Sequence, residues 1–260
     1  DPDFVSVRAY LSLDRARLNA GWTAISGQLY YISDWVPIYP ADRLDIVKRT
    51  IPAHGLPARP VDVFEQQIAR IWLVTDTRQA VRRDVVAFYN WDKDRAEISA
   101  TPQRIGLPPA KEYVGFDFWA NKFIPPFTGN LTASLPGHSS RIMAIRPVSE
   151  NPQLLSTSRH VTQGIVDVTG ESWDAGKAEL SASSKLIAND PYELRIVVPS
   201  AENSWRATSI KVSPEDEAAG VKADIHFCHD LATSLAAAPR YHLPQSRLLR
   251  PPAARGAGIA

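Results

Sequence analysis

The hydrophobic pattern changes its period near residue 82, and this change constrains the fold more than any other feature of the sequence. Before that point, apolar residues recur at intervals of three and four, which indicates helices with one buried face. After it, apolar residues stand in short runs separated by Pro, Gly and Asp, which is typical of antiparallel strands joined by turns. We therefore predict an α/β segment over residues 1–82, followed by all-β structure.

The first segment predicts a helix, a strand and a second helix. Gly27 ends the first helix, whose apolar face consists of Leu11, Leu18, Trp22 and Ile25. Residues 29–32 form an unbroken apolar run, which predicts a strand covered on both faces, as strands of parallel sheets are. The second helix is expected between Pro40 and Pro52. Its apolar stripe consists of Leu44, Val47 and Ile51.

Two all-β zones follow, each built of short apolar runs. The runs in the first zone, residues 83–148, are 85–89, 96–100, 113–116, 131–135 and 141–145. Their spacing predicts an antiparallel β-sandwich. The runs in the second zone, residues 149–228, are 153–158, 164–169, 192–198, 207–212 and 223–227, and they predict a second, smaller β domain. Residues 229–260 are rich in Ala, Pro and Arg without an apolar period, so we expect a disordered tail.

Acidic residues at two expected strand ends are the candidate functional site. Asp34 follows the run 29–32, and Asp3 lies 31 residues earlier, which is about one strand–helix unit of roughly 30 residues. The ends of neighbouring parallel strands meet at one edge, where Asp1, Asp3 and Asp34 would accept hydrogen bonds from sugar hydroxyls and Trp35 would contact a sugar face. The alternative is that the first aspartates form a turn and Asp34 is a loop or cap residue.

Several motifs occur in an order that carries a family resemblance. They are Asp1-Pro2-Asp3-Phe4, Gly27-Gln28-Leu29-Tyr30-Tyr31-Ile32-Ser33-Asp34, Ala58-Arg59-Pro60-Val61-Asp62, Val86-Ala87-Phe88-Tyr89-Asn90-Trp91, Asp117-Phe118-Trp119 and Leu135-Pro136-Gly137-His138. As an ordered series they resemble the melibiase-type α-galactosidases. The first two motifs are similar to the last two strands of that clan's (β/α)8 barrel, and the others are similar to its carboxyl-terminal β-sandwich.

This resemblance implies a fold and a role for individual residues. Residues 1–82 would be the carboxyl-terminal end of a (β/α)8 catalytic barrel, residues 83–148 the β-sandwich, and the next zone an extra β domain. Asp3 matches a substrate-contacting aspartate of the clan, and Asp34 matches the aspartate of barrel strand eight. Phe4 stands where the clan has Met, so the resemblance leaves the identity of the sugar open.

The resemblance also implies which part of the enzyme is missing. The clan consists of retaining glycoside hydrolases whose two catalytic aspartates lie on earlier barrel strands, which would precede Asp1. Since the chain opens without an initiator Met, we expect a fragment that lacks the N-terminal barrel half and is inactive alone. Related activities, such as that of an α-N-acetylgalactosaminidase, remain alternatives. The alternative from another class is a carbohydrate-binding or structural β module without catalytic activity.

Composition argues against other classes of partner. A net charge of +1 gives no surplus of cations for nucleic acid, and no apolar run is long enough to span a bilayer. The single cysteine, Cys228, excludes an internal disulfide. Its neighbours His226 and His229, with His242, have an unsuitable spacing for zinc. We therefore expect neither a metal nor a cofactor, and the sequence indicates no compartment.

Overall fold

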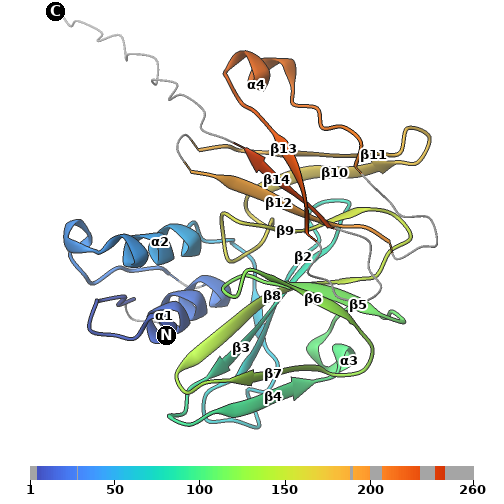
Figure 1. The fold of residues 1–260 in the computed structure, drawn as a ribbon. Coiled ribbons are helices and arrows are strands. Elements are labelled where there is room, and N and C mark those ends of the chain that lie inside the picture. Colours follow the sequence, from blue (N-terminus) through green and yellow to red (C-terminus); the bar gives the residue numbers. More distant parts are fainter. Residues whose placement is uncertain (1–4, 28, 188–189, 200–206, 229–237, 244–260) are drawn as a thin grey trace, which may run out of the picture.

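The computed structural model of the protein describes residues 5–27, 29–187, 190–199, 207–228 and 238–243. Figure 1 shows two helices beside a β-sandwich, with a second group of strands packed near one end of its sheet. Asp1, Asp3 and Phe4 lie outside the described residues, as does most of the expected tail.

The first helix, α1 (Leu13–Ser26), forms where its apolar pattern predicts it. It begins at Ser12, whose side chain accepts a hydrogen bond from the Arg15 amide, and this bond satisfies one of the free amides of the first turn. It ends at Gly27, whose φ of 69° is the left-handed conformation that favours glycine. A Cβ at Gly27 would lie only 2.8 Å from the Leu56 carbonyl oxygen, which leaves no room for a side chain.

The second helix, α2 (Ala41–Thr50), follows the short 3-10 helix η1 (Val36–Ile38) and lies between the two expected prolines. Its buried residues are Arg43, Ile46, Val47 and Thr50. The predicted stripe is therefore wrong in part, because Val47 is buried but Ile51 lies beyond the helix and is 39% exposed. The burial follows from packing against α1 and the chain near Val5, with which Ile46 and Val47 share a core.

The run 29–32 is not the doubly covered strand that the sequence predicts. Leu29 and Tyr31 are 66% and 60% exposed, because only Tyr30 and Ile32 pack, against the core formed by α1 and α2. The predicted parallel direction is nevertheless present, as one bridge between Val5 and Ile32. The Val5 amide donates to the Tyr31 carbonyl oxygen at 2.7 Å.

A six-stranded antiparallel sheet is the centre of the molecule. In spatial order its strands are β1 (Ala58–Pro60), β2 (Ile71–Asp76), β3 (Arg83–Asn90), β8 (Ser139–Pro147), β5 (Tyr113–Asp117) and β6 (Lys122–Phe127). The expected boundary at residue 82 therefore falls inside this sheet, because β1 and β2 come before it. Strands β3, β5 and β8 form where the apolar runs predict them.

One face of this sheet packs against a smaller layer. That layer consists of the antiparallel pair β4 (Ala96–Ala100) and β7 (Leu131–Leu135) with the short helix α3 (Pro102–Ile105). The two layers enclose a core in which Val86, Phe88 and Met143 face Ile98 and Leu135. This is the β-sandwich that the sequence predicts.

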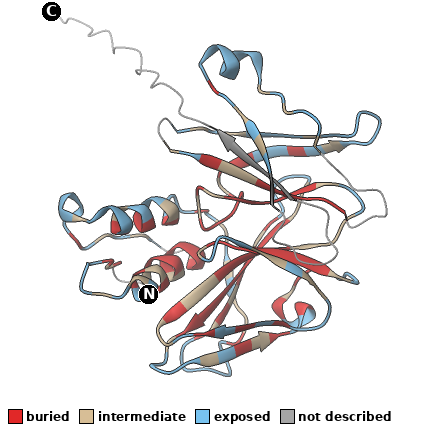
Figure 2. Cartoon of the chain, in the orientation of Figure 1, coloured by how far each residue is buried: buried red, intermediate tan, exposed pale blue. Residues whose placement is uncertain are grey.

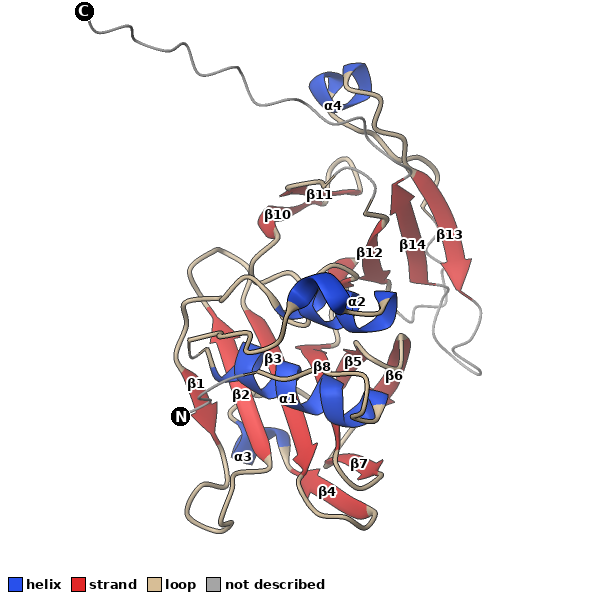
Figure 3. Cartoon of the chain, turned by 90° about the vertical axis from the view of Figure 1, so that its left-hand side faces the viewer, coloured by secondary structure: helices blue, strands red, loops and turns tan. Residues whose placement is uncertain are grey.

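The opposite face of the sheet is covered by α1, as Figure 3 shows. Leu18 and Ile25 of the helix share a core with Val85 and Tyr89 of β3 and Ile142 of β8. Figure 2 shows α1 coloured almost entirely as buried or intermediate residues. The helix predicted as part of a barrel is therefore also a structural part of the sandwich.

A second group of strands packs on the same face, next to α1. Its four-stranded sheet has the order β13 (Asp224–Cys228), β14 (Ala238–Leu243), β12 (Tyr192–Val197) and β9 (Gln153–Thr157). A separate hairpin contains β10 (Val168–Asp174) and β11 (Glu179–Ser184), and the short helix α4 (Pro214–Ala218) precedes β13. Three predictions need correction. Residues 164–167 of the run 164–169 form a turn, so β10 begins only at Val168. Residues 207–212 form no strand, and residues 238–243 of the expected disordered tail form β14.

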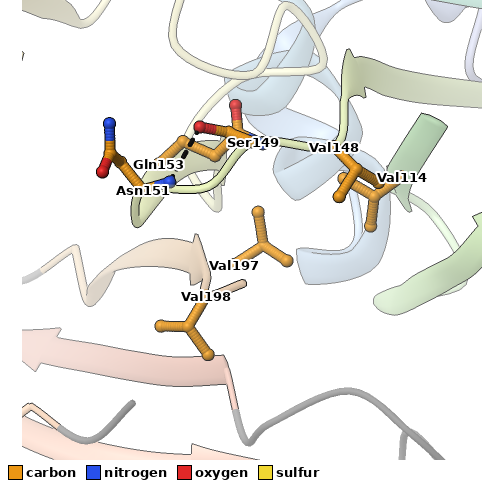
Figure 4. Close-up of a pocket in the computed structure, with 7 residues that line it drawn as sticks. All are labelled: Val114, Val148, Ser149, Asn151, Gln153, Val197 and Val198. Atoms are coloured by element: carbon orange, nitrogen blue, oxygen red, sulfur yellow. Dashed lines mark hydrogen bonds between the residues drawn. The ribbon is translucent and has the colours of Figure 1, made fainter. Parts of the chain in front are cut away.

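The junction between the two parts is closely packed. Val114 and Phe116 of β5 share a core with Leu155 and Val197 of the second group. Figure 4 shows a cavity at this junction, lined by Val114, Val148, Ser149, Asn151, Gln153, Val197 and Val198. Its volume of about 10 Å³ leaves room for one water molecule at most, so it is no sugar site.

Candidate functional site

Asp34 lies at the end of the parallel pair and is the described residue on which the predicted site depends. Its side chain is only 2% exposed. The Val7 amide and the Tyr39 hydroxyl donate to Oδ2 at 3.0 and 2.7 Å. Nε of Arg8 donates to Oδ1, and the Ser6 hydroxyl lies 3.4 Å from the same oxygen. The carboxylate therefore joins the segment after Val5 to the loop before α2.

These contacts keep the Asp34 carboxyl group ionised. Burial alone would raise the pKa of Asp34, but hydrogen bonds from Tyr39, Arg8 and the Val7 amide outweigh it and lower that pKa. Burial and the neighbouring Asp34 carboxylate raise the pKa of Tyr39, so its hydroxyl keeps its proton and remains a donor. Asp34 is therefore a carboxylate at neutral pH, paired with a charged Arg8.

The same contacts limit the chemistry that Asp34 can perform. Each of its oxygens already accepts hydrogen bonds from the chain, which uses most of the lone pairs of an ionised carboxylate. A sugar hydroxyl would have to displace one of these donors. The role of Asp34 in substrate binding stays a prediction, and its role in holding two loops together is a property of the structure.

Trp35 has the exposure that a sugar contact requires. Its side chain is 70% exposed, directly after the buried Asp34. Ile38 is 77% exposed in the same loop, and Tyr10 is 75% exposed in the loop that follows Val5. Tyr10 is absent from the residues predicted from the sequence, although its position shortly after an expected strand end was a signal for it. Asp1, Asp3 and Phe4 lie outside the described residues, so their predicted roles stay predictions.

The family-like motifs of the sandwich have structural roles. Asn90, at the end of β3, donates through Nδ2 to the carbonyl oxygens of Asp94, Leu135 and Pro136 at 2.7, 3.2 and 2.9 Å. It thereby ties the end of one layer to the other. At the adjoining Gly137, a Cβ would lie 1.8 Å from the Lys93 carbonyl oxygen, so only glycine fits.

The described residues also bear on metal binding and on membrane insertion. No group of three or more His, Cys, Asp or Glu side chains is arranged there to hold a metal ion. No helix within the same residues has the length and apolar character needed to cross a bilayer. His226 lies on β13, whereas His229 is outside the described residues.

Part of the chain also matches a known protein family. Residues 71–145, which run from β2 to the later part of β8, match the α-galactosidase C-terminal β-sandwich domain. None of the curated proteins compared with the chain matches it.

Solved structures similar to the chain include several glycosidases. α-Galactosidase I from Mortierella vinacea is 14% identical, with a TM-score of 0.44 over 56% of this chain and 38% of that one. The α-galactosidase from Saccharomyces cerevisiae with raffinose is 14% identical, with a TM-score of 0.42 over 56% and 46%. A β-L-arabinopyranosidase from Geobacillus stearothermophilus is 16% identical, with a TM-score of 0.45 over 54% and 32%. The chain thus spans less than half the length of each.

The family match falls on the sandwich that the sequence predicts, and it includes the motif around Asn90 and the turn at Gly137. It confirms the resemblance to the melibiase-type enzymes. Residues 71–145 are thus similar to the α-galactosidase C-terminal β-sandwich domain.

Proposed function

We propose that the chain is the carboxyl-terminal part of a retaining glycoside hydrolase that acts on α-galactosides or related glycosides. The observation that carries this proposal is the family match over residues 71–145. The parallel bridge between Val5 and Ile32, with Asp34 just beyond it, supports a barrel end in front of that sandwich. Asp1, Asp3, Phe4, Asp34 and Trp35 would contribute part of the sugar-binding rim.

The catalytic pair would belong to another part of the enzyme. A retaining glycosidase needs two carboxyl groups roughly 5–5.5 Å apart, one as nucleophile and one as general acid and base. Asp34 is unsuited to either role, because donors from the chain occupy both of its oxygens and lower its pKa. We therefore place the catalytic aspartates upstream of Asp1 and propose that the chain alone is inactive.

The missing partner would be the N-terminal barrel half. Leu29 and Tyr31 expose apolar side chains on the outer face of the segment that bridges Val5. A strand segment with one bridge leaves backbone donors and acceptors free for a neighbour. A preceding barrel strand would cover both the side chains and the backbone.

Hydrolysis of an aryl α-galactoside tests this proposal. The 260-residue chain should give no turnover, and the chain preceded by the protein segment encoded directly before Asp1 should release the aryl group. Aryl β-galactoside and aryl α-glucoside serve as controls for anomer and sugar. Turnover by the chain alone, or an upstream segment without two barrel-strand aspartates, would contradict the proposal.

One observation favours the second candidate, a structural β module without catalytic activity. Asp34 is fully engaged within the chain, as a purely structural residue would be. In that case the longer polypeptide would also fail to hydrolyse any of the aryl glycosides. The same assay therefore decides between the two candidates.

A further inference from the structure

The last turn of α2 is tied to the second group of strands by direct contacts. The Val161 amide, in the loop between β9 and β10, donates to the Arg49 carbonyl oxygen at 2.8 Å, and Val161 is fully buried. Both terminal nitrogens of Arg49 donate to the Asp190 carboxylate, just before β12, at 2.8 and 3.0 Å. Figure 1 shows the end of α2 beside this loop. We call the contacts among Arg49, Val161 and Asp190 the α2 latch.

The α2 latch contains a second arginine besides Arg49. Nε of Arg159 lies 3.5 Å from Oδ2 of Asp190, and the Arg159 side chain is 3% exposed. Burial alone would raise the pKa of Asp190, but hydrogen bonds and charges from the two arginines lower it, so it is a carboxylate at neutral pH. Asp45 forms a further ion pair with Arg49 at 3.1 Å, on the exposed side of α2. A new positive charge in the latch would therefore face both arginines.

His160 brings a titratable ring to this position, because it lies between Arg159 and Val161 in the chain. Its Nδ1 is buried and has no hydrogen-bond partner among the described residues. In a ring without a proton on Nδ1, this nitrogen is an unused acceptor. In the charged ring it is a buried donor without an acceptor, which costs free energy.

The charged groups around the His160 ring come from α2 and from its own loop. Burial is the largest effect, and it lowers the pKa of His160 below the ordinary 6.5. Asp167, at the end of the loop, opposes this effect, whereas Arg159 and Arg49 add to it. The backbone of Lys48 also favours the charged ring, but the balance remains on the side of the neutral one.

Asp167 is the carboxylate that faces the ring, and other side chains hold it in place. Its Oδ2 accepts hydrogen bonds from the hydroxyls of Thr157 and Tyr192 at 2.8 and 2.9 Å. Its Oδ1 is buried without a partner among the residues that the structure describes, so it makes no hydrogen bond to His160. The closed latch thus contains no acceptor in place for a proton on Nδ1.

We propose that the α2 latch is an acid-sensitive switch, which is closed while the His160 ring is neutral and opens when the ring takes up a proton. In the open latch the ring is in water, where it carries the charge without an unsatisfied donor and without two arginines beside it. The second group of strands then loses its contact with α2, while α2 stays on α1 through Ile46 and Val47. The switch does not depend on the proposed function.

Hydrogen exchange of the Val161 amide measures the opening of the latch on the full 260-residue chain. An open-state ring with the ordinary pKa of 6.5 is about nine-tenths protonated at pH 5.5, so the opening constant should rise up to about tenfold between pH 7.5 and 5.5. Since the pKa of the closed state is lower, the latch is most stable above pH 6.5 and weakens as the pH falls below it. Rates are corrected for the intrinsic pH dependence of exchange.

A second amide separates opening of the latch from unfolding of the whole chain. Val86, in the middle of β3, should exchange only when the central sheet unfolds. We therefore expect Val86 to stay far more protected than Val161 at both pH values.

Two variants and one control assign the pH dependence to the ring. His160→Gln should remove the pH dependence at Val161, because an amide side chain takes up no proton in this range. His226→Gln, at an exposed position on β13, should leave it unchanged. Asp190→Asn should speed up the exchange of Val161 already at pH 7.5, because Arg49 loses its bidentate partner. The His160 ring of the wild-type chain, followed by NMR, should titrate below pH 6.5, which needs no variant.

The opposite results would overturn the proposal. A Val161 amide as protected as Val86 at both pH values would show that the latch does not open by itself. An unchanged pH dependence in His160→Gln would assign it to another group. A His160 ring that titrates above pH 6.5, with slower exchange at Val161 in acid, would show that the charged ring pairs with Asp167 and closes the latch instead.

Discussion

At the residue scale, Asp34 accepts hydrogen bonds from two segments of the chain, residues 6–8 and Tyr39. A buried carboxylate that loses its charge leaves Arg8 without its partner and weakens three further hydrogen bonds. Bonds to charged groups contribute about 1.5–3 kcal/mol each, with strong dependence on context. The cluster is therefore an important local anchor of the segment before α1.

We expect Asp34→Asn to lower the free energy of unfolding by about 2 kcal/mol at pH 7. The folded state lowers the pKa of Asp34 below its ordinary value of 3.8, so its contribution is complete above that value and is lost as the pH falls below it. Urea unfolding at pH 7 and pH 3 measures both effects. Asp42→Asn, at a side chain 55% exposed, is the control. An equal difference at both pH values would contradict the prediction.

Asn90 has a similar role inside the sandwich, through its three bonds to backbone carbonyl oxygens. We expect Asn90→Ala to reduce the free energy of unfolding by about 3 kcal/mol, because buried carbonyl groups lose their donor. Guanidinium chloride unfolding of this variant, compared with Asn151→Ala at an exposed position, measures the effect. A loss as small as that of the control would show that water replaces the amide.

At the element scale, α1 can be assigned either to a barrel end or to the β-sandwich. It follows a barrel-like parallel bridge, yet it packs on the sheet of the sandwich through Leu18 and Ile25. The Tyr89 hydroxyl of β3 donates to the Gly21 carbonyl oxygen at 3.2 Å, which needs a close approach of helix and sheet. The helix and the sheet should therefore unfold together.

Ile25→Ala tests that coupling, because Ile25 is fully buried. We expect a loss of about 2–5 kcal/mol, the usual result of removing a buried Ile side chain. The Val86 amide, in the middle of β3, should exchange faster, because its free energy of opening falls by the same amount. Arg15→Ala, on the exposed side of α1, is the control. An exchange rate at Val86 that is the same in the Ile25→Ala variant as in the wild type would mean that the sandwich is stable without the helix.

The elements differ in how well local sequence predicts them. The strands at 85–89, 96–100, 113–116, 131–135 and 141–145 form as expected, because each is an apolar run between turn residues. β6 was missed because Pro125 and Pro126 argue against a strand, but prolines are tolerated at a sheet edge. β2 was missed because its run lies before the change of period, and its membership is decided by pairing with β3.

The candidate site, too, could be predicted only where the signal is local in the sequence. Asp34 was predicted because it follows an apolar run, which is a local signal. Its donors Ser6 and Arg8 were not, since they are 28 and 26 residues away along the chain. Only the parallel arrangement of the backbone brings these side chains together.

At the scale of the whole molecule, a buried charge cluster holds the second group of strands on the sheet. Glu171 of β10 accepts from Arg83 of β3 at 2.5 Å and from Arg146 of β8 at 3.0 Å. It also accepts from the Leu154 amide at 3.1 Å. The side chains of Glu171 and Arg83 are 5% and 8% exposed, so removal of one charge leaves the other buried without a partner.

We expect Glu171→Ala to cost about 3–5 kcal/mol, because it leaves two arginines unpaired at the junction. Calorimetry should show a lower midpoint, and Arg83→Met added to the variant should recover part of the loss. Lys177→Ala, which breaks an exposed ion pair with Asp174, should change stability by less than about 1 kcal/mol. A Glu171 variant as stable as the Lys177 variant would contradict the prediction.

Two histidines should make the chain sensitive to mild acid. Burial, with nearby arginines, lowers the pKa of His54 and His160 below the ordinary 6.5. The unfolded chain then binds more protons than the folded one below pH 6.5, so stability falls as the pH drops from there. Thermal unfolding between pH 7.5 and 5 measures the slope. His54→Gln and His160→Gln should each flatten it, and an unchanged slope in both would exclude them as its source.

The shared core of α1 and the sheet has a consequence for engineering. A designer who grafts this sandwich onto a catalytic domain would be tempted to cut between α2 and β1. Such a cut would remove the contacts of Leu18 and Ile25 with Val85 and Ile142. It would leave apolar side chains of the sheet exposed on the graft. The transplantable unit starts before Leu13, so a successful chimera includes α1 along with the sandwich.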